Sequence, residues 1–340
     1  MNKRVTQQHI ADLAGVSRQL VSLVSRNSAA VSDSTRRRVL QVMREEGFSP
    51  TVQPRVSGRG LVGVVVPDLS NQFFGLWAQS LRAEGSRRGV TVLMVSTTFD
   101  RQTEKSAIEE LLRIGVDSLV LASSSLELAE IEDYALRVPL CQISRSSLTR
   151  SSVSVQSDDY DGGKQATVHL IDQGYSPVVY LGLNRSHPGD SVIERMRGYN
   201  FVLEEAGKAD ESIALHVNLA SLRTTAEHVL NEYGPKVGIV AHNDTLALAI
   251  INVAYHLGYR PGADFGIVGF DNTQVARLPG AGISSMDQKV PLMCKRVFDL
   301  LDKLMGVPGE IATLSEGQRR IVTRQELKIR ESSTPNQESN

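Results

Sequence analysis

The chain has 340 residues, of which 41% are hydrophobic and 22% are charged, and its formal net charge is −1 at pH 7. This length is typical of two or three globular domains. The sequence holds no apolar run of 18 residues and does not start with the apolar stretch of a secretory signal. These features argue against a membrane-spanning or exported protein, and we expect a cytoplasmic one.

Charge is distributed unevenly along the chain. Residues 1–60 hold ten Lys and Arg against four Asp and Glu, a net charge of +6, so the remainder carries −7. A basic head on an acidic body favours a polyanionic partner for the head, although charge alone fits a solvated basic face equally well. Cys141 and Cys294 lie in separate apolar stretches without metal-ligand spacing, which indicates buried thiols in a reducing compartment.

Three short helices are predicted in residues 6–48. Thr6 is a good N-cap for the first helix, and Gly15 can adopt the positive φ that ends it. The apolar residues expected to share one face of this helix are Ile10, Leu13 and Ala14. Ser17 caps a second helix over residues 18–25, and a third begins near residue 32 and ends at residue 47. Two helices joined by a glycine-containing turn form a helix-turn-helix unit.

The second helix carries side chains that suit the major groove of DNA. Arg18 can donate two hydrogen bonds to guanine, and Gln19 can pair with adenine. Both lie at the exposed start of the helix, where a helix-turn-helix unit meets base edges. Val21 and Val24 share a different face that can pack inward. The backbone N–H groups after Ser17 suit a phosphate.

Residues 49–60 contain two prolines and two glycines, which is typical of a linker. From Leu61 onward, short β-branched runs alternate with longer amphipathic stretches, and this alternation predicts parallel sheets covered by helices. The expected domains are a DNA-binding headpiece (1–48), a linker (49–60), a core (61–330) and a disordered polar tail (331–340). Within the core we expect lobe N at about 61–160 and 290–325, and lobe C at about 161–289.

The headpiece sequence resembles that of the lactose-repressor/galactose-repressor (LacI/GalR) family. The resemblance rests on Val5-Thr6-x3-Ile10-Ala11-x-Leu13-Ala14-Gly15-Val16-Ser17-x3-Val21-Ser22-x-Val24, followed by Val31-Ser32 and Thr35-Arg36. It implies that Arg18, Gln19 and Leu23 occupy base-reading positions. It also implies phosphate contacts from Thr6, Ser17 and Ser22. Leu23 cannot hydrogen-bond, so it either meets a thymine methyl group or contributes little.

The linker departs from the family pattern of Asn, two residues and then Ala-Arg-Ser-Leu. In the family this segment forms a hinge helix on DNA, whose leucine inserts into the minor groove. Here Arg55 matches, whereas Ser57 stands at the leucine position and Pro54 requires any helix to begin at or just before it. We favour Val56 as a smaller wedge in a shifted register. A weak kink and a plain flexible tether remain the alternatives.

The core resembles the same family to about residue 325. The resemblance rests on the segments Val65–Phe74, Gly115–Val120, Val155–Gly163, Glu194–Tyr199, Ala241–Ala247 and Val268–Asn272. It implies the type I fold of periplasmic binding proteins, with two Rossmann-like lobes, three crossovers and a ligand in the cleft. The predicted fold class is thus an all-α helix-turn-helix headpiece plus an α/β core.

Ligands of open α/β sheets bind beyond the carboxyl ends of strands, and several polar residues follow strand-like runs here. The expected effector-binding residues are Asn71, Phe73, Arg145, Arg195, Asn243, Asp271 and Gln288. By the resemblance, the last four match ligand-contact positions. Phe74 is expected in the core, and Asp158 and Asn272 are alternatively simple turn caps. Ser144 replaces the aspartate of the family's Asp-Arg pair, which disfavours a plain hexose.

Together these features predict a sequence-specific DNA-binding repressor controlled by a sugar or related polar metabolite. We expect a homodimer on near-palindromic double-stranded DNA, with a helix at residues 73–88 in the interface through Ala78 and Leu81. The rival classes are a transporter's solute-binding protein and a nucleotide-binding enzyme. The missing signal and the basic head argue against the first. The second lacks a phosphate loop or catalytic motif, so no enzyme activity, cofactor or metal is expected.

Overall fold

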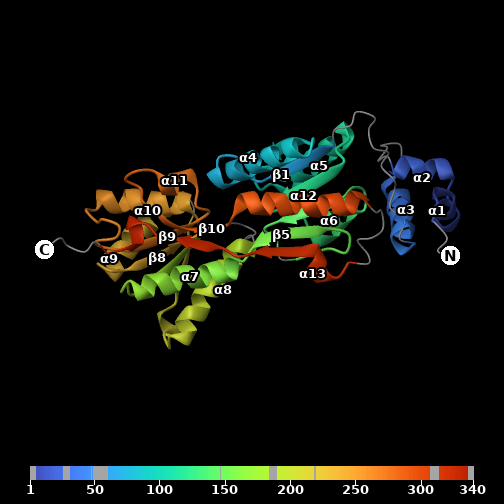
Figure 1. Ribbon diagram of the computed structural model, residues 1–340. Coiled ribbons are helices and arrows are strands. Elements are labelled where there is room, and N and C mark those ends of the chain that lie inside the picture. The colour runs from blue at the N-terminus through green and yellow to red at the C-terminus, as the bar shows by residue number, and fades with distance from the viewer. Residues whose placement is uncertain are drawn as a thin grey trace. The chain divides into compact units, whose positions relative to one another are not determined.

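The computed structural model describes residues 5–25, 31–46, 48, 60–145, 147–183, 190–217, 220–306 and 314–335 (Figure 1). The hinge residues Arg55 and Val56, with their neighbours Pro54 and Ser57, lie outside these ranges. The chain divides into two compact units. The first unit comprises Met1–Leu69, Trp77–Gln156 and Pro291–Ile321, and the second comprises Ser70–Leu76, Ser157–Val290 and Val322–Asn340.

The headpiece contains three helices within its described residues: α1 (Gln7–Ala14), α2 (Arg18–Ser25) and α3 (Asp33–Glu45). The Thr6 hydroxyl accepts the His9 amide at 3.3 Å and so caps α1. Gly15 ends α1 at φ 63°. The Ser17 hydroxyl accepts the Leu20 amide at 3.2 Å at the start of α2. The sequence therefore predicted both helix starts and the turn between them from residues that satisfy the free backbone groups of helix ends.

A small hydrophobic core joins the three helices. Its buried residues are Ile10, Ala11, Ala14, Val21, Val24, Val31, Val39, Leu40 and Met43. The inward packing expected of Val21 and Val24 is confirmed. The expectation for Leu13 is wrong, because its side chain is 51% exposed. The buried face of α1 is centred between Ile10, Ala11 and Ala14, and Leu13 lies about 100° around the helix from that centre.

The first unit is built on a six-stranded sheet, counted over the described residues, with the order β11-β5-β4-β3-β1-β2. Its strands are β1 (Leu61–Val66), β2 (Thr91–Ser96), β3 (Ser118–Ala122), β4 (Leu140–Ile143), β5 (Val153–Ser157) and β11 (Arg320–Thr323). The pairs from β2 through β1, β3 and β4 to β5 are parallel. The helices are α4 (Gln72–Arg87), α5 (Arg101–Ile114), α6 (Leu128–Ala135), α12 (Val290–Gly306) and α13 (Glu316–Arg319).

Two contacts hold this unit together in different ways. Strands β1, β3 and β4 pack against α5 and α6 through one cluster of buried side chains, which includes Ile108, Leu111 and Ile131. Helices α4 and α12 are joined by Arg88, whose guanidinium meets Asp299 at 2.6 Å and Asp302 at 2.5 Å. Leu81 of α4 is fully buried, so it cannot serve in the dimer contact expected of it.

The second unit is built on another six-stranded sheet, again over the described residues, with the order β12-β10-β9-β8-β6-β7. Its strands are β6 (Val178–Leu183), β7 (Ile213–Val217), β8 (Gly238–Ala241), β9 (Gly266–Phe270), β10 (Ser284–Asp287) and β12 (Glu326–Lys328). All pairs are parallel except β10 with β12. The helices are α7 (Asp159–Asp172), α8 (Asp190–Glu205), α9 (Leu222–Tyr233), α10 (Asp244–His256) and α11 (Gln274–Arg277), with short 3-10 turns at Ala209–Glu211 and Glu331–Ser333.

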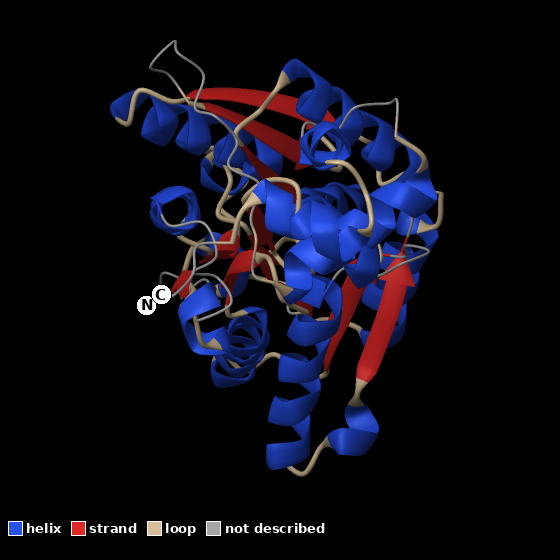
Figure 2. Cartoon of the chain, turned by 90° about the vertical axis from the view of Figure 1, so that its right-hand side faces the viewer, coloured by secondary structure: helices blue, strands red, loops and turns tan. Residues whose placement is uncertain are grey.

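Separate hydrophobic clusters cover the two faces of this second sheet. One packs α9 and α10 against β6, β8 and β9, and the other packs α7 and α8 against the opposite face. Figure 1 shows α10 on one side of these strands and α7 with α8 on the other. The cartoon in Figure 2 shows blue helices packed around red strands. The α/β alternation predicted from the sequence is thus confirmed.

Helices α7 and α8 approach each other closely because each contributes a glycine. A Cβ atom added to Gly163 would lie 2.2 Å from the carbonyl oxygen of Arg195. In return, a Cβ atom added to Gly198 would lie 2.1 Å from the carbonyl oxygen of Tyr160. The absence of a side chain at both positions permits this backbone contact. It brings Arg195 of α8 against the start of α7.

The expected disorder of residues 331–340 is wrong for the described part of that segment. Ser332 and Ser333 are buried, and Glu331–Ser333 forms a 3-10 turn. Polar composition predicted exposure, but the two hydroxyls find buried partners. Ser332 donates to the carbonyl of Ile267 at 2.7 Å. Residues 336–340 lie outside the described ranges.

Candidate functional site

The start of α2 presents polar side chains on the headpiece surface. Arg18 and Gln19 are exposed, whereas Ser22 and Leu23 are half-buried. The hydroxyls of Thr6 and Ser17 each accept a backbone amide. Capping uses an oxygen lone pair and leaves the hydroxyl hydrogen for another acceptor, such as a phosphate oxygen.

One side-chain pair connects the two ends of the headpiece sequence. His9 of α1 lies 3.0 Å from a carboxylate oxygen of Glu46, just after α3. Both side chains are partly exposed, so this pair contributes little to stability. It joins the first helix to the residue that follows the third.

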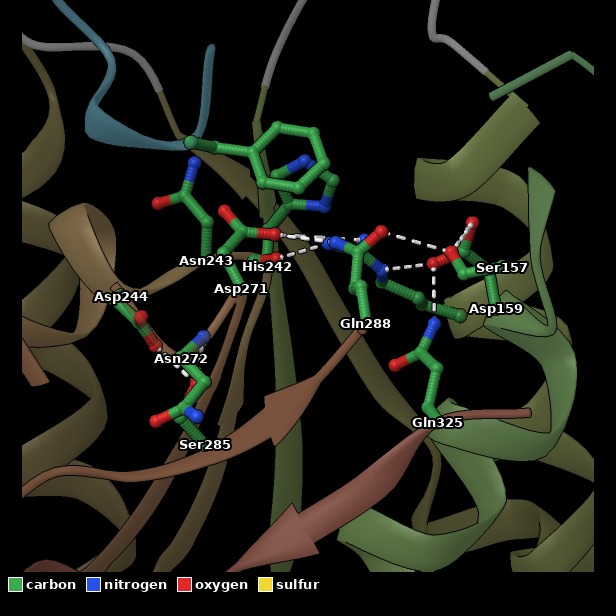
Figure 3. A network of polar contacts seen from close by, with 12 residues as sticks. Ser157, Asp159, His242, Asn243, Asp244, Asp271, Asn272, Ser285, Gln288 and Gln325 are labelled. Atoms are coloured by element: carbon green, nitrogen blue, oxygen red, sulfur yellow. Dashed lines mark hydrogen bonds and ion pairs between the residues drawn. The ribbon is translucent and has the colours of Figure 1, made fainter. Parts of the chain in front are cut away.

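In the second unit, three neighbouring parallel strands end in polar residues. Asn243 follows β8, Asp271 follows β9 and Gln288 follows β10. The carboxyl ends of parallel strands lie at one edge of a sheet, where open α/β sheets bind ligands. Figure 3 shows these side chains at that edge, together with Ser157 and Asp159.

Arg195 is the cation that contacts this group, and it is 3% exposed. Its Nε donates to Asp159 at 2.8 Å, and its Nη1 donates to the carbonyl of His242 at 2.5 Å. Its Nη2 lies 3.9 Å from Asp271, and its guanidinium lies over the ring of Phe270, 4.2 Å from the centroid. A buried guanidinium needs such partners, because burial of an unpaired charge is costly.

Asp271 is held in a backbone conformation that favours glycine, with φ 97°. Its Oδ1 accepts from Gln288 at 2.5 Å, and the Oε1 of Gln288 accepts from Ser157 at 2.8 Å. Burial raises the pKa of Asp271 to about 7, and the nearby Arg195 opposes that rise. We call Ser157, Asp159, Arg195, Asp271 and Gln288 the Arg195 network.

A third buried carboxylate, that of Asp244, lies beside the two in this network. Asp244, the first residue of α10, accepts the Ser285 hydroxyl at 2.5 Å. Its other oxygen accepts the amide and hydroxyl of Thr273 at 2.7 and 2.8 Å. Burial raises the pKa of Asp244 to about 6, while these hydrogen bonds lower it. Asp244 thus holds the turn that follows Asp271.

Of the seven expected effector residues, the structure joins Arg195, Asp271 and Gln288 in this network. Asn243 is buried and follows His242, whose carbonyl accepts from Arg195, but the Asn243 side chain caps α10 by accepting the Leu246 amide at 2.8 Å. Asn71 accepts the Phe73 amide at 3.0 Å. Asn71 and Phe73 belong to Ser70–Leu76, a segment that groups with the second unit and not with the predicted lobe N.

Arg145, by contrast, belongs to the first unit. Its Nη1 donates to the carbonyls of Ser124 and Leu126 at 3.3 and 2.7 Å. Asp158 caps α7 by accepting the Asp161 amide at 3.0 Å, as its alternative interpretation proposed. Phe73 and Phe74 are both buried, with ring centroids 5.4 Å apart.

Sequence reasoning missed Asp159, Asp244 and Gln325. Asp159 carried a usable signal, since it follows a strand at the first crossing between lobes. Gln325 donates to Asp159 at 3.0 Å but lies 166 residues away, and no local pattern predicts such a pair. The described residues contain no group of three or more His, Cys, Asp or Glu side chains that could hold a metal ion. Nor does any described helix have the length and apolar character to cross a bilayer.

A helix-turn-helix headpiece joined to two parallel-sheet α/β units defines the class of ligand-controlled transcriptional regulators. Comparison with known proteins gives the family. Residues 6–51 match the family model described as "Bacterial regulatory proteins, lacI family". Residues 59–290 match "Periplasmic binding proteins and sugar binding domain of LacI family". The chain belongs to the LacI family of DNA-binding transcriptional regulators.

Individual relatives agree with this assignment. The chain is 30% identical over 300 residues to the HTH-type transcriptional regulator DegA of Bacillus subtilis (strain 168), which covers 85% of this chain and 88% of DegA. It is similar to the transcriptional regulator CelR in complex with cellobiose, with a TM-score of 0.66 and 25% identity. The match covers 97% of this chain and 100% of the CelR chain. It shares its fold with the lac repressor dimer bound to operator and an anti-inducer, with a TM-score of 0.68 and 23% identity. The match covers 98% of this chain and 100% of the lac repressor chain.

Proposed function

We propose that this regulator represses transcription as a homodimer and that a neutral sugar or related polyol, bound at the Arg195 network, controls its affinity for operator DNA. The observation that carries the effector site is the convergence of Arg195, Asp271 and Gln288 at one sheet edge, with Asp271 in a strained backbone conformation. Strain of about 1–3 kcal/mol at one residue persists where the surroundings enforce it, and such residues cluster at ligand sites.

The chemistry of the network suits a ligand rich in hydroxyl groups. A carboxylate accepts hydrogen bonds from hydroxyls, and a guanidinium donates to hydroxyl oxygens from a fixed planar fork. The network supplies one cationic donor, Arg195, between two carboxylate acceptors, Asp159 and Asp271. The family description as a sugar-binding domain and the cellobiose complex of CelR support the same class of ligand.

On the DNA side, we propose base contacts from Arg18, Gln19 and Leu23 and phosphate contacts from Thr6, Ser17 and Ser22. One headpiece makes few contacts, so two headpieces on a near-palindromic site are needed for specificity. The lac repressor, which shares the fold, is a dimer on its operator. The hinge contribution of Arg55 and Val56 stays a prediction, as does the absence of enzyme activity. We propose that the protein acts in the cytoplasm, at the nucleoid when bound to its operator, since its partner is DNA.

Control by the effector requires a difference in affinity between two conformations. A ligand that binds both equally shifts nothing, however tightly it binds. The effects of sugar and operator on each other's affinity are therefore reciprocal. A sugar that weakens operator binding by a given factor must itself bind the operator complex more weakly by the same factor.

The test of DNA recognition is selection of random duplexes by the purified full chain at near-physiological salt, followed by sequencing. We expect a palindrome that is lost in Arg18→Ala/Gln19→Ala. The matched control is Gln41→Ala, since Gln41 is exposed on α3, bonds Glu45 at 3.0 Å and lies outside α2. Retention of DNA without sequence preference would contradict the proposal, because it would leave only electrostatic attachment.

The test of the effector site uses the selected operator and a panel of neutral sugars that includes D-ribose and cellobiose. We expect one sugar to shift operator affinity in wild type and to lose its effect in Arg195→Met. The control is Arg197→Met on the same helix, because Arg197 is 61% exposed and pairs with Glu194. Equal loss in both variants, or an unchanged response in Arg195→Met, would remove the network from effector binding.

A further inference from the structure

The C-terminal segment Arg330–Thr334 is fastened to the second unit by hydrogen bonds along its length. The amide of Arg330 donates to the Ser284 hydroxyl at 2.8 Å. Ser333 donates to the same hydroxyl at 2.6 Å, and its own hydroxyl lies 2.7 Å from Nε2 of His169. Gly262 has no room for a side chain, since its Cβ would lie 2.2 Å from the carbonyl oxygen of Glu331. A segment with a polar composition is therefore an integral part of the fold.

One side chain of this segment extends toward the polar edge of the sheet. Nη1 of Arg330 donates to the carbonyl of Ile283 at 2.5 Å, and Nη2 donates to Oδ1 of Asn272 at 2.6 Å. The two acceptors belong to different loops, and the planar guanidinium meets them with two separate nitrogens. A lysine would have to reach both from a single nitrogen without that fixed geometry.

Asn272 belongs to a strained corner, Asp271–Thr273, between β9 and α11. Asp271 and Asn272 are consecutive non-glycine residues with positive φ, 97° and 47°. Asn and Asp adopt such conformations more readily than other residues, yet two in succession must be held by their surroundings. The first of them, Asp271, carries the carboxylate of the Arg195 network.

Several hydrogen bonds hold this corner in addition to those from Thr273 to Asp244. The amide of Asp271 donates to the carbonyl of Met286 at 2.9 Å, and the amide of Asn272 donates to the Ser285 hydroxyl at 2.9 Å. Arg277 donates to the carbonyl of Asn272 at 2.7 Å and, through Nε, to its Oδ1 at the longer distance of 3.4 Å. Arg330 is the contact that reaches the corner from the C-terminal segment.

From this geometry we infer that Arg330 is a positioning residue for the effector site, because it fixes Asn272 and thereby the backbone that aims the Asp271 carboxylate. The inference rests on the proposed function only in naming the site. The positioning itself is a property of the ligand-free protein. Loss of the Arg330 fork leaves the Asn272 side chain with the longer, 3.4 Å hydrogen bond from Arg277, so the corner relaxes toward negative φ and turns Asp271 away from Gln288.

The experiment compares hydrogen exchange of full-length wild type and Arg330→Met, which keeps the aliphatic stem and removes the fork. We expect exchange of the amides of Asp271, Asn272 and Thr273 to rise about tenfold or more, with strands β6 and β8 unchanged. The side-chain amide signals of Gln288, which donates to Asp271, should shift in NMR spectra. The matched control is Lys328→Met, two residues earlier, whose ammonium pairs with Glu326.

A double-mutant cycle separates positioning from general stability. Asn272→Gly accepts positive φ without strain and removes the acceptor of Arg330, so adding Arg330→Met to it should change corner exchange by less than twofold. Arg330→Lys should restore little protection. A uniform rise in exchange across the second unit, an unchanged corner in Arg330→Met, or additive effects in the cycle would each overturn the inference. Because no ligand is involved, failure of the sugar panel leaves this result intact.

Discussion

The contact between α7 and α8 leads to a prediction with opposite signs at two glycines. Gly163→Ala places a Cβ 2.2 Å from the carbonyl oxygen of Arg195, whereas real Cβ atoms essentially never approach within 3.0 Å. The obstacle is backbone and cannot rotate away, so the helices must part by about 1 Å. Gly75→Ala in α4 is the matched control, because nothing lies within 4 Å of its Cβ and its φ is not positive.

The magnitudes follow from two terms. Replacement of glycine by alanine inside a helix favours the folded state by about 0.5–1 kcal/mol. Forcing an extra carbon into a filled space costs about 1–3 kcal/mol, and a rigid backbone obstacle belongs at the upper end. We therefore expect Gly163→Ala to lower the free energy of unfolding by about 2 kcal/mol. Gly75→Ala should raise it by about 0.5–1 kcal/mol.

Urea unfolding of the full chain, followed by circular dichroism, measures both changes. The separation of the helices should also lengthen the 2.8 Å contact between Arg195 and Asp159 and weaken any sugar response of Gly163→Ala at operator DNA. If Gly163→Ala were as stable as Gly75→Ala, the two helices would not be in backbone contact, and the placement of Arg195 by this contact would be refuted.

Three further predictions concern single side chains. Burial raises the pKa of Asp271 to about 7 from 3.8, so this group favours the folded state below the unfolded pKa and loses that contribution as pH rises to about 7. Urea unfolding of the wild type should show a free energy of unfolding that falls with rising pH by up to about 1.4 kcal/mol per pH unit. This slope should be shallower in Asp271→Asn, and equal slopes in the two proteins would contradict the prediction. The Arg88 side chain is 22% exposed and pairs with three carboxylates, so Arg88→Met should lower the free energy of unfolding by about 2 kcal/mol or more. Arg87→Met, at 73% exposure, should cost less than about 0.5 kcal/mol, and similar losses in the two would show that the α4–α12 pairs are not structural. Thr6→Ala should speed amide exchange in α1 and cost about 1 kcal/mol, whereas Thr6→Ser should not; equal exchange in both would exclude the cap.

Much of the fold was predictable because local rules agreed with the final packing. Strand β1 begins at Leu61, the residue from which alternating β-branched runs and amphipathic stretches were predicted. Thr6, Gly15 and Ser17 fixed the headpiece helices by satisfying helix ends. Arg195 and Gln288 followed from the family resemblance, and Asp271 followed from the resemblance and from its place after a strand-like run.

The rest depended on partners that no local pattern reveals. Leu13 belongs to a broad apolar stripe, and only the packing of α2 and α3 decides which part of that stripe is buried. The buried state of Ser332 and Ser333 depends on acceptors elsewhere in the second unit, which composition does not report. Helix α12 is 17 residues long and was not predicted as a helix, although its residues were placed in lobe N, because strand-like runs guided the prediction.

The Arg195 network also has an electrostatic consequence for the choice of ligand. One guanidinium faces two carboxylates, so with Asp271 ionised the group carries a net negative charge, and with Asp271 protonated it is neutral. In neither state does it offer a spare cation. A phosphorylated sugar would bring its own negative charge to this edge of the sheet and meet repulsion where a free sugar meets hydrogen-bond partners. The proposed effector site would therefore favour a free sugar over its phosphorylated form.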